Sequence, residues 1–291
     1  MKRLEHPRLV LGESARWLPA QGRFAWMDLM ERRLFFAAPD GGSIESVAVD
    51  APGPLGALLA TGEPERALLT CATGLASLDL SSGAHTPVMP FETGREGMYL
   101  NDAGVDAQGR IWLGSYHVDE AGPFGVLYCC NLRTGTQSIA DSGFIVPNGP
   151  AVSADGKTLF FSSSFERTVL AYDIDPAADR LVRRRVHIRF DEKDGLPDGL
   201  ACDAEGCLWV AHWEGACVTR HAPDGAEISR LSLPTPLVTS VAFGGEDMRS
   251  LLITTASVTL DDDALASDPD AGSVFIARVE SPGAETFEAA L

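Results

Sequence analysis

The hydrophobic residues of this chain fall in short runs that are separated by turn-forming residues. Typical runs are Phe24–Met27, Ile111–Leu113 and Leu208–Val210, and each begins two residues after a glycine. Short aromatic and β-branched runs are typical of β-strands, whereas an amphipathic helix needs a longer apolar stripe with a period of 3.6 residues. Because long helical patterns are scarce, the chain is predicted to be all-β.

One unit, a turn followed by an apolar strand, recurs along the chain. Its six copies are marked by the turn residues Gly22, Glu65, Gly109, Gly156, Gly206 and Asp247. In four copies the marker is a glycine, which can adopt the positive φ that tight hairpins require. An aspartate in several of these turns would stabilise them through its side-chain oxygen. The repeat therefore predicts six hairpins of the same kind.

The spacing of the markers suggests one architecture. Consecutive markers are 41 to 50 residues apart, and six units of about 48 residues fill the 291-residue chain. A four-stranded propeller blade takes about 40–50 residues. The spacing predicts a six-bladed β-propeller with four-stranded blades around a central channel, formed by residues 1–291 as a single domain. The alternative is a β-sandwich, or two of them, which would make six near-equal spacings a coincidence.

Charge narrows the range of partners. The chain carries 41 acidic and 23 basic residues, a formal net charge of −18, and 45% of its residues are hydrophobic. This apolar content is too high for a disordered acidic protein. Nucleic acid and anionic membrane surfaces both require clustered Lys and Arg, so we expect neither as a partner.

The sequence shows no sign of export. Glu5, Pro7 and Arg8 occupy the place of the apolar segment of a secretory signal, and no run of 18 apolar residues exists. We therefore expect a cytoplasmic protein, either a monomer or a small homo-oligomer. Its six cysteines are expected to be reduced and mostly buried, although Cys202 and Cys207 flank a turn and could face each other across a hairpin.

Four polar residues occupy similar positions relative to the predicted turns. Asn101, Asn148 and Asp198 each precede a marker glycine by eight residues, and Glu13 precedes its glycine by nine. Singly, Asn-Gly and Asp-Gly are ordinary turn formers. The shared offset instead predicts four oxygen donors on one face of the channel, a set that suits a hard divalent cation. The identity of the metal (Ca, Mg, Mn, Zn or Fe) cannot be read from such a set.

The sequence resembles the SMP-30/gluconolactonase, or regucalcin-like, family of six-bladed propellers over essentially its whole length. The resemblance rests on Gly12–Trp17, Asn101-Asp102 with Val105–Trp112, Asn148-Gly149 with Ser153–Lys157, Pro197–Gly199 and Phe243–Gly245. It implies one divalent metal bound by Glu13, Asn148 and Asp198, with Asn101 as a substrate-binding residue or an outer ligand. It also implies hydrolysis of a sugar lactone to the sugar acid.

The expected chemistry needs no nucleophilic side chain. A metal polarises the lactone carbonyl and stabilises the developing oxyanion while water attacks. Asp198 is the best candidate for the general base, because a carboxylate next to both metal and water can accept a proton. The chain contains no Gly-x-Ser-x-Gly, His-Glu-x-x-His, Walker A or dinucleotide-binding pattern.

The chain departs from the family pattern near the expected pocket. Tyr99 stands where many members carry an arginine, and Tyr116 and His117 follow a glycine where members often have Gly-Thr-Met. A tyrosine offers one hydroxyl and a flat face in place of a fork of donors. These residues and Trp213, which could stack on a sugar face, are predicted to bind substrate, and His212 could line the same mouth. We expect a substrate range that differs from that of the arginine-bearing members.

Two other functions remain compatible with the sequence. The same metal site could hydrolyse other activated esters or phosphotriesters, or the scaffold could bind a metal or sugar without catalysis. A metal-free propeller of the strictosidine-synthase type is disfavoured by the retention of Glu13 and Asp198.

Overall fold

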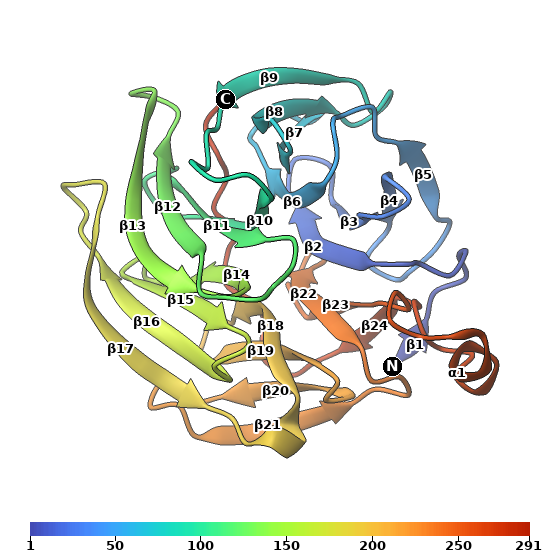
Figure 1. Cartoon of the computed structure of the whole chain (residues 1–291). Helices are drawn as coiled ribbons and strands as arrows, with labels where there is room; N and C mark the ends of the chain where they lie inside the picture. The colour runs from blue at the N-terminus through green and yellow to red at the C-terminus, as the bar shows by residue number, and fades with distance from the viewer.

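Six antiparallel sheets of four strands each surround a central axis (Figure 1). The structure is a computed structural model that describes residues 1–291. Each sheet is one blade, so the predicted six-bladed β-propeller is confirmed. In five blades the strands follow the chain from the axis outward, because each strand joins the next through a hairpin.

The first three blades follow one another in the N-terminal half of the chain. Blade one contains β2 (Gly12–Leu18), β3 (Arg23–Asp28), β4 (Arg33–Ala37) and β5 (Glu45–Ala48). Blade two contains β6 (Leu55–Ala60), β7 (Arg66–Cys71), β8 (Gly74–Asp79) and β9 (His85–Pro90). Blade three contains β10 (Met98–Val105), β11 (Ile111–His117), β12 (Gly125–Asn131) and β13 (Thr136–Phe144).

The other blades complete the circle. Blade four contains β14 (Pro147–Val152), β15 (Thr158–Ser163), β16 (Thr168–Ile174) and β17 (Leu181–Arg189). Blade five follows the 3-10 helix η1 (Glu192–Asp194) and contains β18 (Leu196–Cys202), β19 (Leu208–Trp213), β20 (Cys217–His221) and β21 (Glu227–Ser232). Blade six contains β22 (Val238–Gly244), β23 (Ser250–Thr255), β24 (Phe275–Arg278) and β1 (Lys2–Arg3), with α1 (Asp262–Ser267) between β23 and β24.

The predicted turn markers all lie in one kind of hairpin. Each marker falls between the first and second strands of its blade. The four marker glycines have positive φ, for example +77° at Gly109 and +81° at Gly206. This is the conformation for which glycine was expected at these turns, because a side chain would be strained there.

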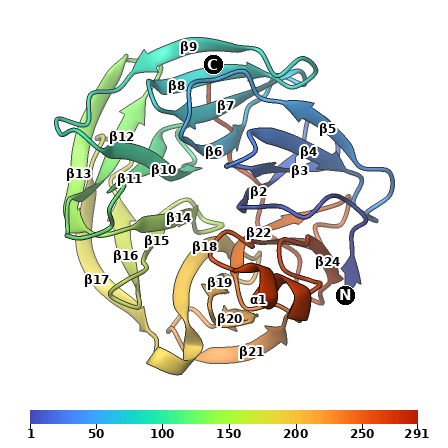
Figure 2. The same ribbon diagram turned by 45° about the vertical axis from the view of Figure 1, so that its right-hand side comes forward.

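The two ends of the chain close the ring. Strand β1 pairs with β24, so the outermost strand of blade six comes from the N-terminus. The fully buried Leu4 and Leu9 hold this segment, and their amides donate to the carbonyls of Val274 and Gly272 at 2.8 and 2.9 Å. In Figure 2, α1 stands in front of blades five and six.

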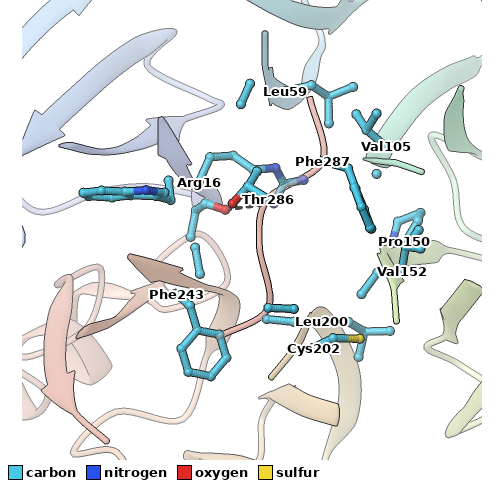
Figure 3. Close-up of a pocket in the computed structure, with 18 of the residues that line it drawn as sticks. Arg16, Leu59, Val105, Pro150, Val152, Leu200, Cys202, Phe243, Thr286 and Phe287 are labelled. Atoms are coloured by element: carbon cyan, nitrogen blue, oxygen red, sulfur yellow. Dashed lines mark hydrogen bonds between the residues drawn. The ribbon is translucent and has the colours of Figure 1, made fainter. Parts of the chain in front are cut away.

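The C-terminal segment crosses one end of the central channel. Figure 3 shows it passing between Phe243, Leu200 and Leu59, with Phe287 beside Val105. Its backbone is tied to two blades, because the amide of Ala284 donates to Cys202 and that of Ala289 donates to Ala60. These first-strand residues enclose a small cavity of about 130 Å³ at this end.

Apolar side chains fill the spaces between neighbouring blades. The cluster between blades three and four is typical and includes Trp112, Phe144 and Phe161, all fully buried. All six cysteines are buried and unpaired, so Cys202 and Cys207 do not form a disulfide. No helix is long and apolar enough to cross a membrane.

Candidate active site

The same bulge interrupts the first strand of every blade. In each blade two consecutive residues of the first strand lie opposite one residue of the second strand. A β-bulge bends its strand and turns side chains to a new direction. The first strands also pack against each other around the axis. The six bulges therefore form a ring around the channel.

The four predicted oxygen donors all lie at these bulges. Asn101 and Asp198 are the first bulge residues of β10 and β18. Glu13 and Asn148 are the residues just before the bulges of β2 and β14. Asn101 and Asn148 are therefore equally far from their turn glycines in sequence, but their positions relative to the bulge differ by one residue. The cause of this difference is the β14–β15 hairpin, which has one residue fewer between its bulge and Gly156 than β10–β11 has before Gly109.

The structure brings the four donors together at one cavity. The cavity has a volume of about 420 Å³ and lies at the end of the channel away from the C-terminal segment. Sixteen residues line it, and eight of them are apolar. The lining residues whose side chains carry polar groups useful for binding or catalysis include Glu13, Asn101, Tyr116, Glu120, Asn148, Ser164, Asp198 and Trp213. Half the lining is therefore apolar, with polar groups at a few points, as in typical small-molecule sites.

The two amides of the site are held by hydrogen bonds. The side-chain nitrogen of Asn101 donates to Oδ1 of Asn148 at 2.6 Å and to the carbonyl of Pro147 at 2.8 Å. The nitrogen of Asn148 donates to Ser164 Oγ at 3.2 Å. These bonds use the nitrogens and leave oxygen lone pairs free, since an amide oxygen carries two.

Hydroxyl groups bind neighbouring blades to one another at the level of the bulges. Ser14 Oγ accepts from the amide of Leu58 at 2.7 Å, and Ser162 Oγ donates to the carbonyl of Asp198 at 2.7 Å. Between blades six and one, Thr239 Oγ1 donates to the carbonyl of Gly12 at 2.5 Å. The backbones that carry Glu13 and Asp198 are therefore fixed by direct contacts with the next blade.

A buried ion pair lies next to the site. Arg16 donates to Asp102 Oδ1 at 2.9 Å and to the carbonyl of Ala103 at 2.8 Å. The other oxygen of Asp102 accepts from the amide of Gly149 at 2.9 Å. The pair joins blades one, three and four, and Gly149 directly follows Asn148. Sequence reasoning included both residues in the family resemblance but assigned them no role.

The two carboxylates of the site lack a partner of opposite charge. Asp198 is buried, and neither it nor Glu13 forms an ion pair; Glu13 accepts only from the amide of Ser14. Burial and then the charge of Asp102 raise the pKa of Glu13. Burial, followed by the charges of Glu13 and Asp102, raises the pKa of Asp198 well above its usual range. The fold thus keeps two carboxylates close together with no basic side chain paired to either of them.

This donor set fits a divalent cation. Two carboxylates balance a charge of 2+, and the amide oxygens are neutral hard donors. Glu13, Asn148 and Asp198 are the residues that would hold the ion, with Asn101 next to them. An ion with so few protein ligands keeps positions open for water and substrate.

The other predicted site residues divide into two groups. Tyr116 and Trp213 line the cavity, whereas Tyr99 and His117 do not. The ring of Tyr99 lies next to that of Tyr116, with 6.4 Å between the centroids, and His117 packs edge-on against Phe124. His212 is also outside the cavity: it is fully buried, and its Nε2 lies 2.7 Å from Thr219 Oγ1. Side chains alternate along a strand, which turns His212 away from the side that Trp213 faces.

Glu120 and Phe165 are lining residues that sequence reasoning missed. Both lie in connections that follow the second strand of their blade, β11 and β15. No motif marks such positions, because loop length decides which side chain reaches the cavity. The acidic character of Glu120 was the only available signal.

Comparisons with known proteins agree on one family. The model of the SMP-30/gluconolactonase/LRE-like region matches residues 11–257. L-arabinolactonase of Azospirillum brasilense is 33% identical over 285 residues, which cover 97% of this chain and 93% of that protein. Pentonolactonase XacC of Haloferax volcanii is 31% identical over 290 residues, which cover 95% and 94%.

A solved structure extends the agreement to three dimensions. The calcium-binding protein regucalcin from Agrobacterium tumefaciens matches with a TM-score of 0.92 and 27% identity, covering 100% of this chain and 98% of that one. The family match spans five complete blades, and it includes Glu13, Asn101, Asn148 and Asp198. The chain therefore belongs to the SMP-30/gluconolactonase/LRE-like family.

Proposed function

We propose that this protein hydrolyses a sugar lactone to the sugar acid with the help of one divalent cation. The observation that carries the proposal is the pair of unpartnered carboxylates, Glu13 and Asp198, beside the amides of Asn101 and Asn148 at one cavity. The lactonase activities named for two full-length relatives support the reaction class.

Each of these residues has a distinct task in the proposal. Glu13, Asn148 and Asp198 hold the cation, which when bound supplies a Lewis acid for the lactone carbonyl and its developing negative charge. Asp198 takes the proton from the attacking water, because its carboxylate lines the cavity and accepts no hydrogen bond from the chain. Asn101 orients the substrate, and the half-buried Trp213 covers one face of the sugar ring.

A panel assay tests the proposed reaction. Acid release is measured from aldono- and aldaro-lactones after treatment with EDTA, and again after adding Mg²⁺, Mn²⁺, Ca²⁺, Zn²⁺ or Fe²⁺. We expect turnover that is lost with EDTA and restored by at least one cation. Hydrolysis of only aryl esters or phosphotriesters would instead indicate a different hydrolase. Cation binding without any turnover would indicate a binding protein. Lactone turnover that is unchanged by EDTA would refute the metal requirement.

Substitution of the general base gives the first mutational prediction. Asp198→Asn keeps the size of the side chain but cannot accept the proton, so kcat on the best lactone should fall at least about 100-fold. Cation affinity measured by calorimetry should fall as well. Asp155→Asn, in the exposed β14–β15 turn, is the matched control and should leave both unchanged. If Asp198→Asn kept both rate and affinity, Asp198 would not be the base.

A further inference from the structure

The charge of the cavity is one-sided. Its lining contains three carboxylates, from Glu13, Glu120 and Asp198, and no lysine, arginine or histidine. Two carboxylates would balance one divalent cation. The third, Glu120, would then leave the loaded site with a net negative charge.

Glu120 reaches the cavity from the loop that follows β11. Its backbone has a positive φ of +49°, and its amide donates to the carbonyl of His117 at 2.9 Å. Glu120 lines the cavity, and its carboxylate forms no ion pair or hydrogen bond within the chain. Partial burial raises its pKa, as expected for a carboxylate that faces a hollow without a basic neighbour. It also adds to the raised pKa of Tyr116.

Three arginines that lie near lining residues in sequence are committed to other partners. Arg95 stacks on the ring of Phe124, with its guanidinium carbon 3.6 Å from the ring centroid. Arg16 is bound to Asp102 and the carbonyl of Ala103. Arg167 donates to the carbonyl of Gly195 at 2.7 Å. None of the three lines the cavity, so none is placed to receive an anionic group of a substrate.

The remaining lining suits an uncharged ring. Phe165, Val258, Leu29 and Trp213 contribute apolar surface, and Phe165 and Val258 are 44% and 39% exposed. Apolar and aromatic faces of this kind cover the C–H faces of a sugar. A carboxylate, sulfonate or phosphate placed there would lose water without gaining a basic partner, which is costly for a charged group.

We propose that Glu120 makes this site selective for lactones without an ionic substituent. The inference rests on the proposed lactone hydrolysis and adds the substrate class. Glu120 acts by repelling a negatively charged substituent on the substrate, and Tyr116 and Trp213 contact the neutral, hydroxylated part of the substrate. The site thus discriminates by charge as well as by shape.

A matched pair of substrates tests the selectivity. An aldono-1,4-lactone and the aldaro-lactone of the same ring differ only in a terminal CH₂OH or carboxylate group. The ratio of their kcat/KM values is measured for the wild-type protein at low ionic strength and again in about 0.5 M NaCl, where the Debye length is a few ångströms. We expect the neutral lactone to be preferred at low salt, with a smaller preference at high salt.

Variants of Glu120 assign the effect to one residue. Glu120→Gln should raise the relative kcat/KM of the anionic lactone by roughly tenfold, the scale of one removed repulsion near a protein surface. Glu120→Arg should raise it further. Asp119→Asn is the control, because this neighbouring carboxylate is 72% exposed and does not line the cavity. It should leave the ratio unchanged.

The possible outcomes separate this inference from the proposed function. Turnover of both lactones with an equal ratio in wild type and Glu120→Gln would overturn the selectivity and leave lactone hydrolysis standing. If Asp119→Asn changed the ratio of kcat/KM values as much as Glu120→Gln does, the total charge of the loop, rather than Glu120 itself, would be responsible. Absence of turnover with either lactone would refute the proposed function itself.

Discussion

One carboxylate, that of Asp102, connects three blades beside the active site. It pairs with Arg16 of blade one, belongs to blade three and accepts from the amide of Gly149 in blade four. Only 17% of the Arg16 side chain and 9% of the Asp102 side chain are exposed. A buried charge that loses its partner is strongly destabilising, whereas replacing both partners often costs little.

A double-mutant cycle measures this connection. Asp102→Leu should lower the free energy of unfolding by about 3–5 kcal/mol, because Arg16 is left buried without a partner. Arg16→Met/Asp102→Leu should cost clearly less than the sum of the two single changes. Urea unfolding followed by circular dichroism gives the three values. Additive costs would mean that the pair is not energetically coupled.

At the scale of single elements, the bulge of β14 brings two blades into close contact. Gly149 has a φ of +52°, and a Cβ there would lie 2.7 Å from the carbonyl oxygen of Asp198. The same residue donates its amide to Asp102. Ser14, at the equivalent position of β2, also has a positive φ of +54°. Backbone strain of this kind persists where surrounding contacts enforce it.

Gly149→Ala should therefore affect both stability and cation binding. The added methyl group must push the backbone of Asp198 away, so calorimetry should show weaker binding of the activating cation. Unfolding should become easier by about 1–3 kcal/mol. Gly22→Ala is the control, since Gly22 has a similar φ of +62° but no atom within 4 Å of an added Cβ. That variant should lose some stability and keep its cation affinity; equal losses of affinity in both variants would contradict this explanation.

On the scale of the whole molecule, the ring is held closed at two places by segments distant in sequence. The N-terminal strand β1 completes blade six. The C-terminal segment spans the channel from Ala284, bound to Cys202, to Ala289, bound to Ala60. Phe287 packs against the apolar clusters on both sides of blade three, the one shared with blade two and the one shared with blade four. The channel is thus closed at the end away from the active site (Figure 3).

Phe287→Ala should weaken this closure. Removing a half-buried aromatic ring is expected to lower the free energy of unfolding by about 2 kcal/mol, less than for a fully buried phenylalanine. Leu291→Ala is the control in the same segment, because Leu291 is 46% exposed and should change stability by less than about 0.5 kcal/mol. Thermal unfolding of the two variants is compared. Equal melting temperatures would show that the C-terminal segment contributes little to the ring.

The local pattern of the chain was enough to predict its architecture. Short apolar runs, turn glycines such as Gly109 and Gly206, and the regular spacing of turns depend on neighbours in sequence, and they predicted six four-stranded blades. Repetition also gave the positions of Glu13, Asn101, Asn148 and Asp198, because equivalent strand positions in a propeller approach one axis. The structure places all four at one cavity.

Tertiary structure decided what depends on contacts between distant segments. The one-residue difference between Asn101 and Asn148 arises from bulge register, which turn spacing cannot reveal. Whether Glu120 reaches the cavity while His117 packs on Phe124 depends on the path of one loop. The Arg16–Asp102 pair and the C-terminal closure form only once the ring is complete. Sequence alone therefore determined the repeated unit and its oxygen donors. The closed ring determined the surroundings of these donors, because burial and charge pairing depend on residues that are brought together from different blades.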